Sequence, residues 1–138
     1  MSKILVLDND LGNADVIQLV LEEQNHQVKN INQADLLNDS IENFKPDLIV
    51  MDIILDVADG RDLCNLVKRN HDTGHIPIML ITALLESQVD DISCKADGII
   101  FKPFDYNKLT RMVDRLIVPR RHLTNESQYN KNDLDLLS

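Results

Sequence analysis

The sequence predicts an α/β fold of the doubly wound type, with a parallel five-stranded sheet covered by helices on both faces. Short runs in which nearly every residue is apolar recur along the chain, as is typical of strands buried on both faces of a parallel sheet. Segments with helical periodicity follow these runs, so strands and helices alternate as βαβ units. The expected strands are residues 3–7, 27–31, 47–52, 77–82 and 97–101, of which 27–31 has the weakest pattern.

In the first half of the chain, apolar residues at three- and four-residue spacing predict two helices. The first covers residues 11–24 and the second about 33–44, and Pro46 separates the second helix from the central strand. The apolar stripes consist of Ala14, Ile17 and Leu21 in the first helix, and of Ala34, Leu37, Ile41 and Phe44 in the second. Each stripe gives its helix one face that can pack on the sheet.

Three further helices are expected in the second half. Gly60 opens or precedes the third helix, Pro77 opens the next strand, a short helix covers about 85–94, and the last helix covers about 105–118. Their apolar positions are Leu63, Leu66 and Val67, then Leu85, Val89 and Ile92, and finally Leu109, Met112, Val113, Leu116 and Ile117. The last helix has the clearest pattern because its five apolar residues follow helical spacing over two turns and more.

The length of 138 residues fits one domain with a core of ordinary size. We expect residues 1–118 to form this domain. After Pro119 apolar positions become few and asparagines frequent, so residues 119–138 are expected to form a flexible tail. A second domain does not fit in so short a segment.

Charge and hydropathy limit the classes of partner. The chain has 23 acidic and 14 basic residues and a net charge of −9, which disfavours direct nucleic-acid binding through a basic face. No apolar run approaches the roughly 18 residues of a membrane-spanning helix. Residues 1–3 lead directly into a strand without a signal-peptide pattern, so we expect a cytoplasmic location and no membrane partner. Cys64 and Cys94 lack CxxC spacing and are expected to be small half-buried thiols.

Polar residues stand where four of the apolar runs end. Asp8 follows the first run, and Asp52 ends the central one. Thr82 and Lys102 end the last two. Because ligands of open α/β sheets bind beyond the carboxyl ends of the strands, these side chains are expected to meet at one edge. Two carboxylates, a hydroxyl and an ammonium together suit a divalent cation and a phosphoryl group.

Asp52 is the candidate nucleophile of this group. A carboxylate in the crevice can attack a phosphoryl group and form an acyl phosphate. Phosphoryl transfer needs alignment and neutralisation of the equatorial oxygens, which Mg²⁺ supplies when one or two carboxylates hold it. Asp8 and Asp52 are the expected metal ligands. The expected phosphoryl-binding groups are the Lys102 ammonium, the Thr82 hydroxyl and the Ala83 amide.

Each of these residues also has an ordinary structural interpretation. An aspartate that ends a strand is often a turn former or a helix cap, and this applies to Asp8 and Asp10 taken alone. The Lys102-Pro103 bond taken alone would be expected in the common trans form. Convergence of all four polar residues on one sheet edge is what favours the functional interpretation.

The motifs together resemble the receiver domain of two-component response regulators, the family of the bacterial chemotaxis receiver. The resemblance covers residues 3–118 and lies in Asp8, Leu48 to Asp52 with Gly60, Pro77 to Ala83, and Lys102 to Phe104. It implies a flavodoxin-like strand order 2-1-3-4-5, a phosphoacceptor Asp52, and Mg²⁺ held by the residues Asp8, Asn9 and Asp52 and by the Ile54 carbonyl. It also implies a cis bond before Pro103 that aims Lys102, and Thr82, Ile99 and Pro103 as switch residues.

The sequence departs from the family pattern at several positions. Asn9 stands where a second acid is usual, which removes a negative charge, and Asp10 is a possible substitute ligand. Ile99 replaces the usual aromatic switch residue, and Asp56 replaces a usual proline. The segment from Thr82 to Lys102 is shorter than usual, so the fourth helix or its preceding loop is expected to be trimmed.

The resemblance implies a phosphoacceptor switch rather than an enzyme with a separate substrate. A sensor histidine kinase or a phosphotransfer protein would donate the phosphoryl group, and a downstream protein would read the face formed by the fourth helix, the fifth strand and the fifth helix. This face is also a possible homodimer contact. The alternative is a degenerate receiver that binds partners without phosphorylation, which Asn9, Asp56 and Ile99 favour. A nucleotide-binding enzyme or a serine hydrolase is disfavoured because no GxGxxG, P-loop or GxSxG motif occurs.

Overall fold

The protein forms one parallel sheet of five strands in the order β2-β1-β3-β4-β5. The computed structural model describes residues 1–90 and 93–129. The strands are β1 (Lys3–Leu7), β2 (Gln27–Ile31), β3 (Leu48–Asp52), β4 (Ile78–Thr82) and β5 (Gly98–Phe101). The predicted fold class and strand order are confirmed, and each strand begins and ends within one residue of its expected position.

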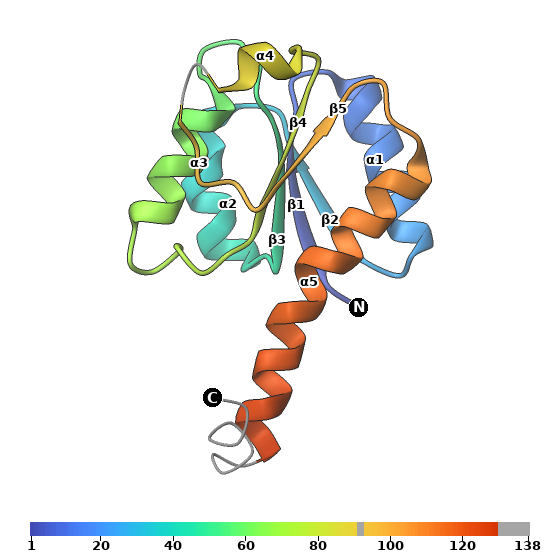
Figure 1. Ribbon diagram of the computed structural model, residues 1–138, viewed down its shortest axis with the longest axis vertical. Helices are drawn as coiled ribbons and strands as arrows, with labels where there is room; N and C mark the ends of the chain where they lie inside the picture. Colours follow the sequence, from blue (N-terminus) through green and yellow to red (C-terminus); the bar gives the residue numbers. More distant parts are fainter. Residues whose placement is uncertain (91–92, 130–138) are drawn as a thin grey trace.

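Helices cover both faces of the sheet (Figure 1). One face carries α1 (Leu11–Glu23) and α5 (Tyr106–Tyr129), and the other carries α2 (Leu37–Phe44) and α3 (Gly60–Arg69). A short 3-10 turn, η1 (Ala34–Leu36), precedes α2, and α4 (Glu86–Val89) lies near the carboxyl ends of the strands. The chain thus builds the helix–sheet–helix layers that alternating βα units require.

The core consists of two apolar clusters, one on each side of the sheet. In β1, Leu5 and Leu7 belong to the cluster beneath α2 and α3, whereas Ile4 and Val6 belong to the cluster beneath α1 and α5. All four side chains are buried, because successive residues of a strand point to opposite faces and both faces are covered. Each such side chain contributes about 1.5–3 kcal/mol on burial. The apolar runs therefore fix the strands, and with them the positions of the polar residues that follow.

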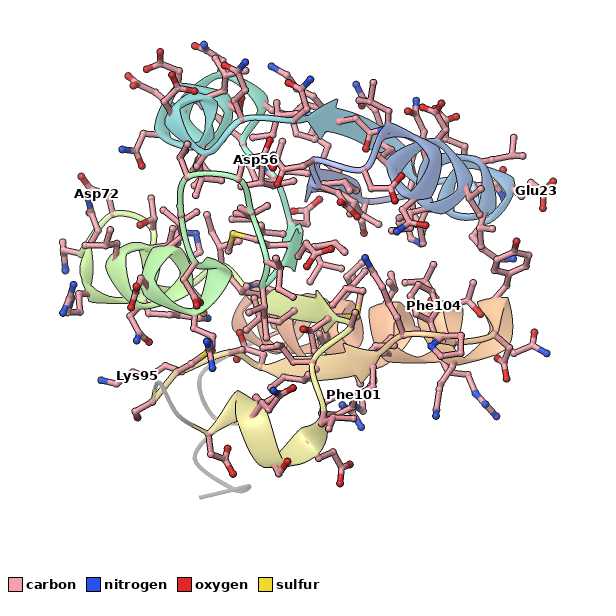
Figure 2. The ribbon with its side chains drawn as sticks, turned by 90° about the horizontal axis from the view of Figure 1, so that it is seen from above. Glu23, Asp56, Asp72, Lys95, Phe101 and Phe104 are labelled. Carbon is pink, nitrogen blue, oxygen red and sulfur yellow. The ribbon has the colours of Figure 1, made fainter. Side chains whose placement is uncertain are left out.

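The register of the strands brings their carboxyl ends to one edge. Asp52 of β3 lies beside Ile81 of β4, and Thr82 of β4 lies beside Phe101 of β5. Figure 2 looks down on this edge, where the loops that follow the strands surround the strand ends. The register thus brings the polar residues predicted from the sequence to this edge.

The fourth and fifth helices differ most in length from the expectation, and α2 begins at Leu37 rather than near residue 33. The fourth helix was expected over 85–94, but α4 ends at Val89, which agrees with a trimmed segment between Thr82 and Lys102. The last helix was expected to end near residue 118, but α5 continues to Tyr129 and runs beyond the body of the domain (Figure 1). The helix continues through Pro119, although a proline inside a helix removes one backbone hydrogen bond and brings its ring against the carbonyl four residues earlier. Residues 130–138 lie outside the described part, so the domain boundary and the flexible tail stay predictions.

None of the helices among residues 1–90 and 93–129 combines the length and the apolar composition that a bilayer crossing requires.

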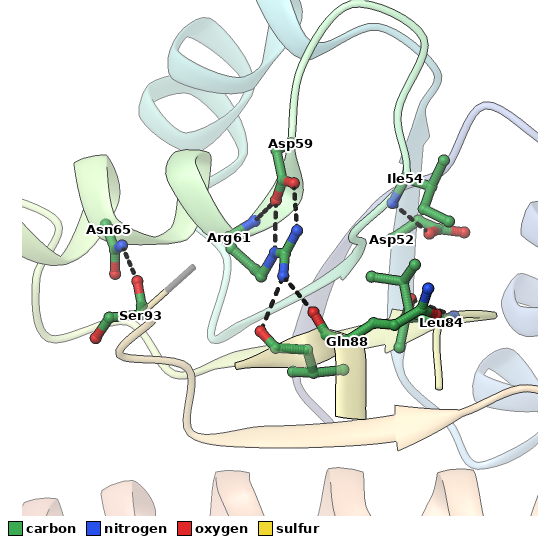
Figure 3. A network of polar contacts seen from close by, with 10 residues as sticks. Asp52, Ile54, Asp59, Arg61, Asn65, Leu84, Gln88 and Ser93 are labelled. Carbon is green, nitrogen blue, oxygen red and sulfur yellow. Dashed lines mark hydrogen bonds and ion pairs between the residues drawn. The ribbon is translucent and has the colours of Figure 1, made fainter. Parts of the chain in front are cut away.

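A buried arginine holds the short α4 against the start of α3 (Figure 3). Arg61, only 7% exposed, makes a two-pronged ion pair with Asp59, with Nε 3.0 Å from Oδ1 and Nη2 2.7 Å from Oδ2. Its Nη1 donates to the carbonyl oxygens of Gln88 and Val89, at 3.1 and 2.8 Å. A four-residue helix has few hydrogen bonds of its own, so these contacts to its last carbonyls stabilise its position.

Substitution Arg61→Ala is expected to lower the free energy of unfolding by about 3 kcal/mol, because it leaves the Asp59 carboxylate without its partner. The Arg61 guanidinium holds the pKa of Asp59 below its ordinary value, chiefly through their side-chain hydrogen bonds. The contribution of the pair is therefore present above the unfolded-state pKa and is lost as the pH falls through the folded-state pKa. Urea denaturation at several pH values measures both effects, with the exposed Arg69→Ala as control. Equal losses for the two variants would contradict this assignment.

Gly60 permits the loop after β3 to fold back onto the strand. Its N–H donates to the Ile53 carbonyl at 2.7 Å, and a Cβ at this position would lie 2.2 Å from the Asp52 carbonyl oxygen. We expect Gly60→Ala to lower the free energy of unfolding by about 3 kcal/mol, because backbone atoms must move to accommodate the methyl group. The control is Gly12→Ala, whose nearest contact is a carboxylate oxygen of Asp10 at 3.3 Å. Urea denaturation compares the two, and a similar small change in both would refute the close approach at Gly60.

Candidate functional site

Four predicted site residues meet at the carboxyl edge of the sheet. Asp8 follows β1, Asp52 is the last residue of β3, Thr82 is the last of β4, and Lys102 follows β5. The two aspartates are almost completely buried, Asp8 with 3% and Asp52 with 6% of its surface exposed. Thr82 is fully buried, whereas the Lys102 side chain is about one-fifth exposed. The edge is therefore a small polar site within an apolar frame.

The shortest contact of the site joins Lys102 to Asp52. The Lys102 Nζ donates to Asp52 Oδ2 at 2.6 Å, and the Ile54 N–H donates to Asp52 Oδ1 at 2.9 Å (Figure 3 draws the latter bond). The Lys102 N–H donates to the Thr82 carbonyl oxygen at 2.7 Å, and the peptide bond from Lys102 to Pro103 is cis. The cis bond implied by the resemblance is confirmed, and the ammonium points at Asp52.

Asp8 carries a buried oxygen that lacks a hydrogen-bond partner within the described residues. Its Oδ1 accepts the Asp10 N–H at 2.9 Å, but its Oδ2 accepts no hydrogen bond and lies 3.9 Å from Lys102 Nζ. Burial raises the pKa of Asp8, and the charge of Asp52 adds to this, although the Asp10 amide and Lys102 act in the opposite direction. An unpartnered carboxylate oxygen beside a second carboxylate is suited to a cation.

Thr82 and Ala83 lie beside this charge cluster. The Thr82 Oγ1 accepts the Leu84 N–H at 3.0 Å, and the hydroxyl still has its proton to donate. Ala83 is exposed and lines, with Lys102 and Pro103, a cavity of about 510 Å³ between the start of α1 and the start of α5. Two of the three residues expected to bind a phosphoryl group, Ala83 and Lys102, therefore border open space, whereas Thr82 is buried beside them.

Asn9 and Asp10 are engaged elsewhere. Asn9 Oδ1 accepts the Asp56 N–H at 3.0 Å, and Asn9 Nδ2 donates to the Asn32 carbonyl at 3.1 Å. Asp10 is the N-cap of α1, with Oδ1 accepting the Asn13 N–H at 3.1 Å. The cap could be inferred from the sequence because an aspartate precedes a helical pattern. The contacts of Asn9 could not be inferred from the sequence, because its two partners are backbone groups that lie far along the chain.

The predicted switch residues lie at the border of the site. Ile99 in β5 lies opposite Leu80, is half-buried, and packs against the apolar cluster beneath α2 and α3. Pro103 is exposed after its cis bond, and Ile54, whose carbonyl is an expected metal ligand, also has an exposed side chain. Pro103 and Ile54 therefore lie in solvent-facing loops of the site, whereas Ile99 connects strand β5 to the core.

The donor set suits Mg²⁺ better than a metal held by a complete protein cage. Within residues 1–90 and 93–129, no three histidine, cysteine or acidic side chains gather as a metal cluster. What the edge offers is two carboxylates, of which one has an unpartnered oxygen, together with loop carbonyls and access for water. Mg²⁺ keeps several waters and binds through one or two carboxylates, so the residues fit this ion.

Comparison with known proteins agrees with the geometry. The response regulator receiver domain family matches residues 4–114. The regulator RpaA of Synechocystis sp., described as a DNA-binding dual master transcriptional regulator, is 28% identical over 119 residues, which are 85% of this chain and 49% of the relative. This chain thus spans about half the length of that curated relative.

Solved receiver domains have the same fold. The receiver domain of a signal transduction histidine kinase from Syntrophus aciditrophicus superposes with a TM-score of 0.80 at 28% identity, covering 86% of this chain and 92% of that one. The receiver domain of a sensor histidine kinase from Pseudomonas aeruginosa, solved with a magnesium ion coordinated in its active-site cleft, superposes with a TM-score of 0.76 at 26% identity, covering 84% and 97%. Because the family matches most of this chain, the chain belongs to the response regulator receiver domains of two-component signalling.

Proposed function

We propose that this receiver accepts a phosphoryl group on Asp52 with the help of Mg²⁺ and then changes a protein-binding surface. The observation that carries the proposal is the contact of a buried Asp52 carboxylate with the Lys102 ammonium, 2.6 Å away, at the end of the central strand. The unpartnered oxygen of Asp8 supports the metal. The family supports a histidine kinase as the source of phosphate, directly or through a phosphotransfer protein.

In the proposed reaction, an oxygen of Asp52 forms a bond to phosphorus while the bond from phosphorus to the donor nitrogen breaks. The leaving imidazole takes the electron pair and is protonated. Lys102 binds one phosphoryl oxygen, and the Thr82 hydroxyl and Ala83 amide donate to another. Mg²⁺, held by Asp8, Asp52 and the Ile54 carbonyl, supplies neutralisation of the remaining phosphoryl charge.

The proposed switch begins with the Thr82 hydroxyl. In the described state its oxygen accepts the Leu84 N–H, at the start of the segment that carries α4. A phosphoryl group on Asp52 would attract the hydroxyl and so move this segment. Ile99 would respond through packing alone, since its β-branched side chain has no polar group. The face of α4, β5 and α5 is the proposed output surface for a downstream protein or a second copy.

A protein partner is supported by the apolar rim of the site. Large apolar side chains are exposed in the loops and at the helix starts that follow four of the strands: Leu11, Ile54, Val57, Leu85 and Tyr106. Exposed apolar groups gathered around a polar site mark a protein-docking surface rather than a site for a small anion alone. A cytoplasmic location and the absence of direct nucleic-acid binding by this domain remain parts of the proposal.

The alternative function is phosphorylation-independent binding by a degenerate receiver. Its specific support is that the Asn9 oxygen faces the Asp56 amide. The two functions differ in one measurable property, because the degenerate receiver would bind neither Mg²⁺ nor beryllofluoride.

The first test is covalent labelling by a small phosphodonor. Incubation with radiolabelled acetyl phosphate should label the chain only when Mg²⁺ is present. Asp52→Asn should reduce labelling to background because the nucleophile is lost, whereas Asp62→Asn, an exposed acid of α3, should leave it unchanged. Intact-mass spectrometry measures the added phosphoryl group. Full labelling of the Asp52 variant would rule out the proposed acceptor.

The second test concerns Asp8. The substitution Asp8→Asn removes a buried carboxylate charge that is only partly hydrogen-bonded. It should therefore raise the free energy of unfolding of the metal-free protein by about 1 kcal/mol. The same change should weaken Mg²⁺ binding by roughly tenfold or more. Urea denaturation and calorimetric Mg²⁺ titration measure the two effects, with the exposed Asp114→Asn as control. A lower stability with undiminished Mg²⁺ affinity would show that Asp8 serves the fold and not the metal.

A further inference from the structure

Asn9 connects three loops at the edge of the site. It lies directly after Asp8, its oxygen accepts the Asp56 N–H from the loop after β3, and its Nδ2 donates to the Asn32 carbonyl after β2. The Asp56 loop passes over the strand ends in Figure 2. The bond to Asp56 joins residues 47 positions apart in the sequence. The amide group therefore spans the end of β1 from one side to the other.

The contact uses both ends of the Asn9 amide. The oxygen accepts from the Asp56 N–H while the nitrogen donates to the Asn32 carbonyl. A carboxylate at this position would turn an oxygen toward the Asn32 carbonyl oxygen, and it would add a negative charge next to Asp8 and Asp10. The orientation of the Asn9 amide is thus set by the loops on both sides.

The Asp56 loop begins with the proposed metal ligand. Ile54 lies two residues before Asp56, and its N–H is bound to Asp52 Oδ1. The loop is thereby held at two points, by Asp52 at Ile54 and by Asn9 at Asp56. Between these points the backbone has little freedom to move its carbonyl groups.

We propose that Asn9 is a positioning residue for the metal site, and that it fixes the segment from Ile54 to Asp56 without coordinating Mg²⁺ itself. This inference rests on the proposed function, since it concerns the same site. The amide also donates to the Asn32 carbonyl, a second contact that an acid could not make because it lacks the donor. Coordination would then come from Asp8, Asp52, the Ile54 carbonyl and water.

The test follows the amide proton of Asp56 by NMR. In the metal-free protein, Asn9→Ala should speed its exchange with water by roughly fivefold or more, because its acceptor is lost. Asn9→Asp should keep this protection, since a carboxylate oxygen can still accept the bond. The control is Asn43→Ala on the exposed side of α2, which should change nothing at Asp56. Unchanged exchange in the Asn9→Ala variant would overturn the proposal.

Mg²⁺ titration of the unsubstituted chain then separates a positioning role from coordination. A positioning role predicts that saturating Mg²⁺ leaves the exchange of the Asp56 amide as slow as before or slower. A ligand role would turn the Asn9 oxygen toward the ion, release this amide and speed its exchange, which would overturn the proposal. Failure of the unsubstituted chain to bind Mg²⁺ would instead overturn the proposed function, and the metal role of Asn9 with it.

Discussion

The contact between the Lys102 ammonium and the buried carboxylates organises this end of the protein. Its Nζ lies 2.6 Å from Asp52 Oδ2 and 3.9 Å from Asp8 Oδ2, so one positive charge stands between two negative ones. The cluster therefore keeps an excess negative charge on two almost completely buried carboxylates, which is unfavourable without a further partner. A bound divalent cation would neutralise this negative charge and leave a net positive charge. A phosphoryl group on Asp52 would then neutralise that positive charge. The same imbalance explains both proposed ligands.

The sequence predicted the fold and the meeting of four site residues because both follow from local patterns. Apolar runs gave the strands, and the register of a parallel sheet brings the residues after them to one edge, so Asp8, Asp52 and Lys102 could be placed without coordinates. The lengths of the helices α4 and α5 were less predictable. The end of α4 at Val89 coincides with the contact that Arg61 makes to the Val89 carbonyl, and α5 continues past Pro119, where a helix ordinarily kinks or ends. Neither is encoded in an apolar stripe.

Two side chains support the loops around the site through contacts that the sequence patterns did not predict. Arg61 joins the start of α3 to the last carbonyls of α4, and Asn9 joins the ends of β1 and β2 to the loop after β3. Sequence patterns could not reveal these contacts because their partners are mostly backbone groups far along the chain, for which residue type carries no signal. Together they connect the proposed metal loop with the proposed output segment. Phosphorylation of Asp52 would therefore act on loops that hydrogen bonds already connect to one another.

We propose that Asp52, Asp8 and Lys102 form one site for Mg²⁺ and a phosphoryl group. The most direct measurement is a crystal structure of the chain grown with Mg²⁺ and beryllofluoride, which mimics the phosphoryl group. We expect beryllium bonded to Asp52, Mg²⁺ in contact with both aspartates, and the Lys102 Nζ moved from Asp52 to a fluoride. An unchanged contact between Lys102 and Asp52, with neither group bound at saturating concentrations, would contradict it.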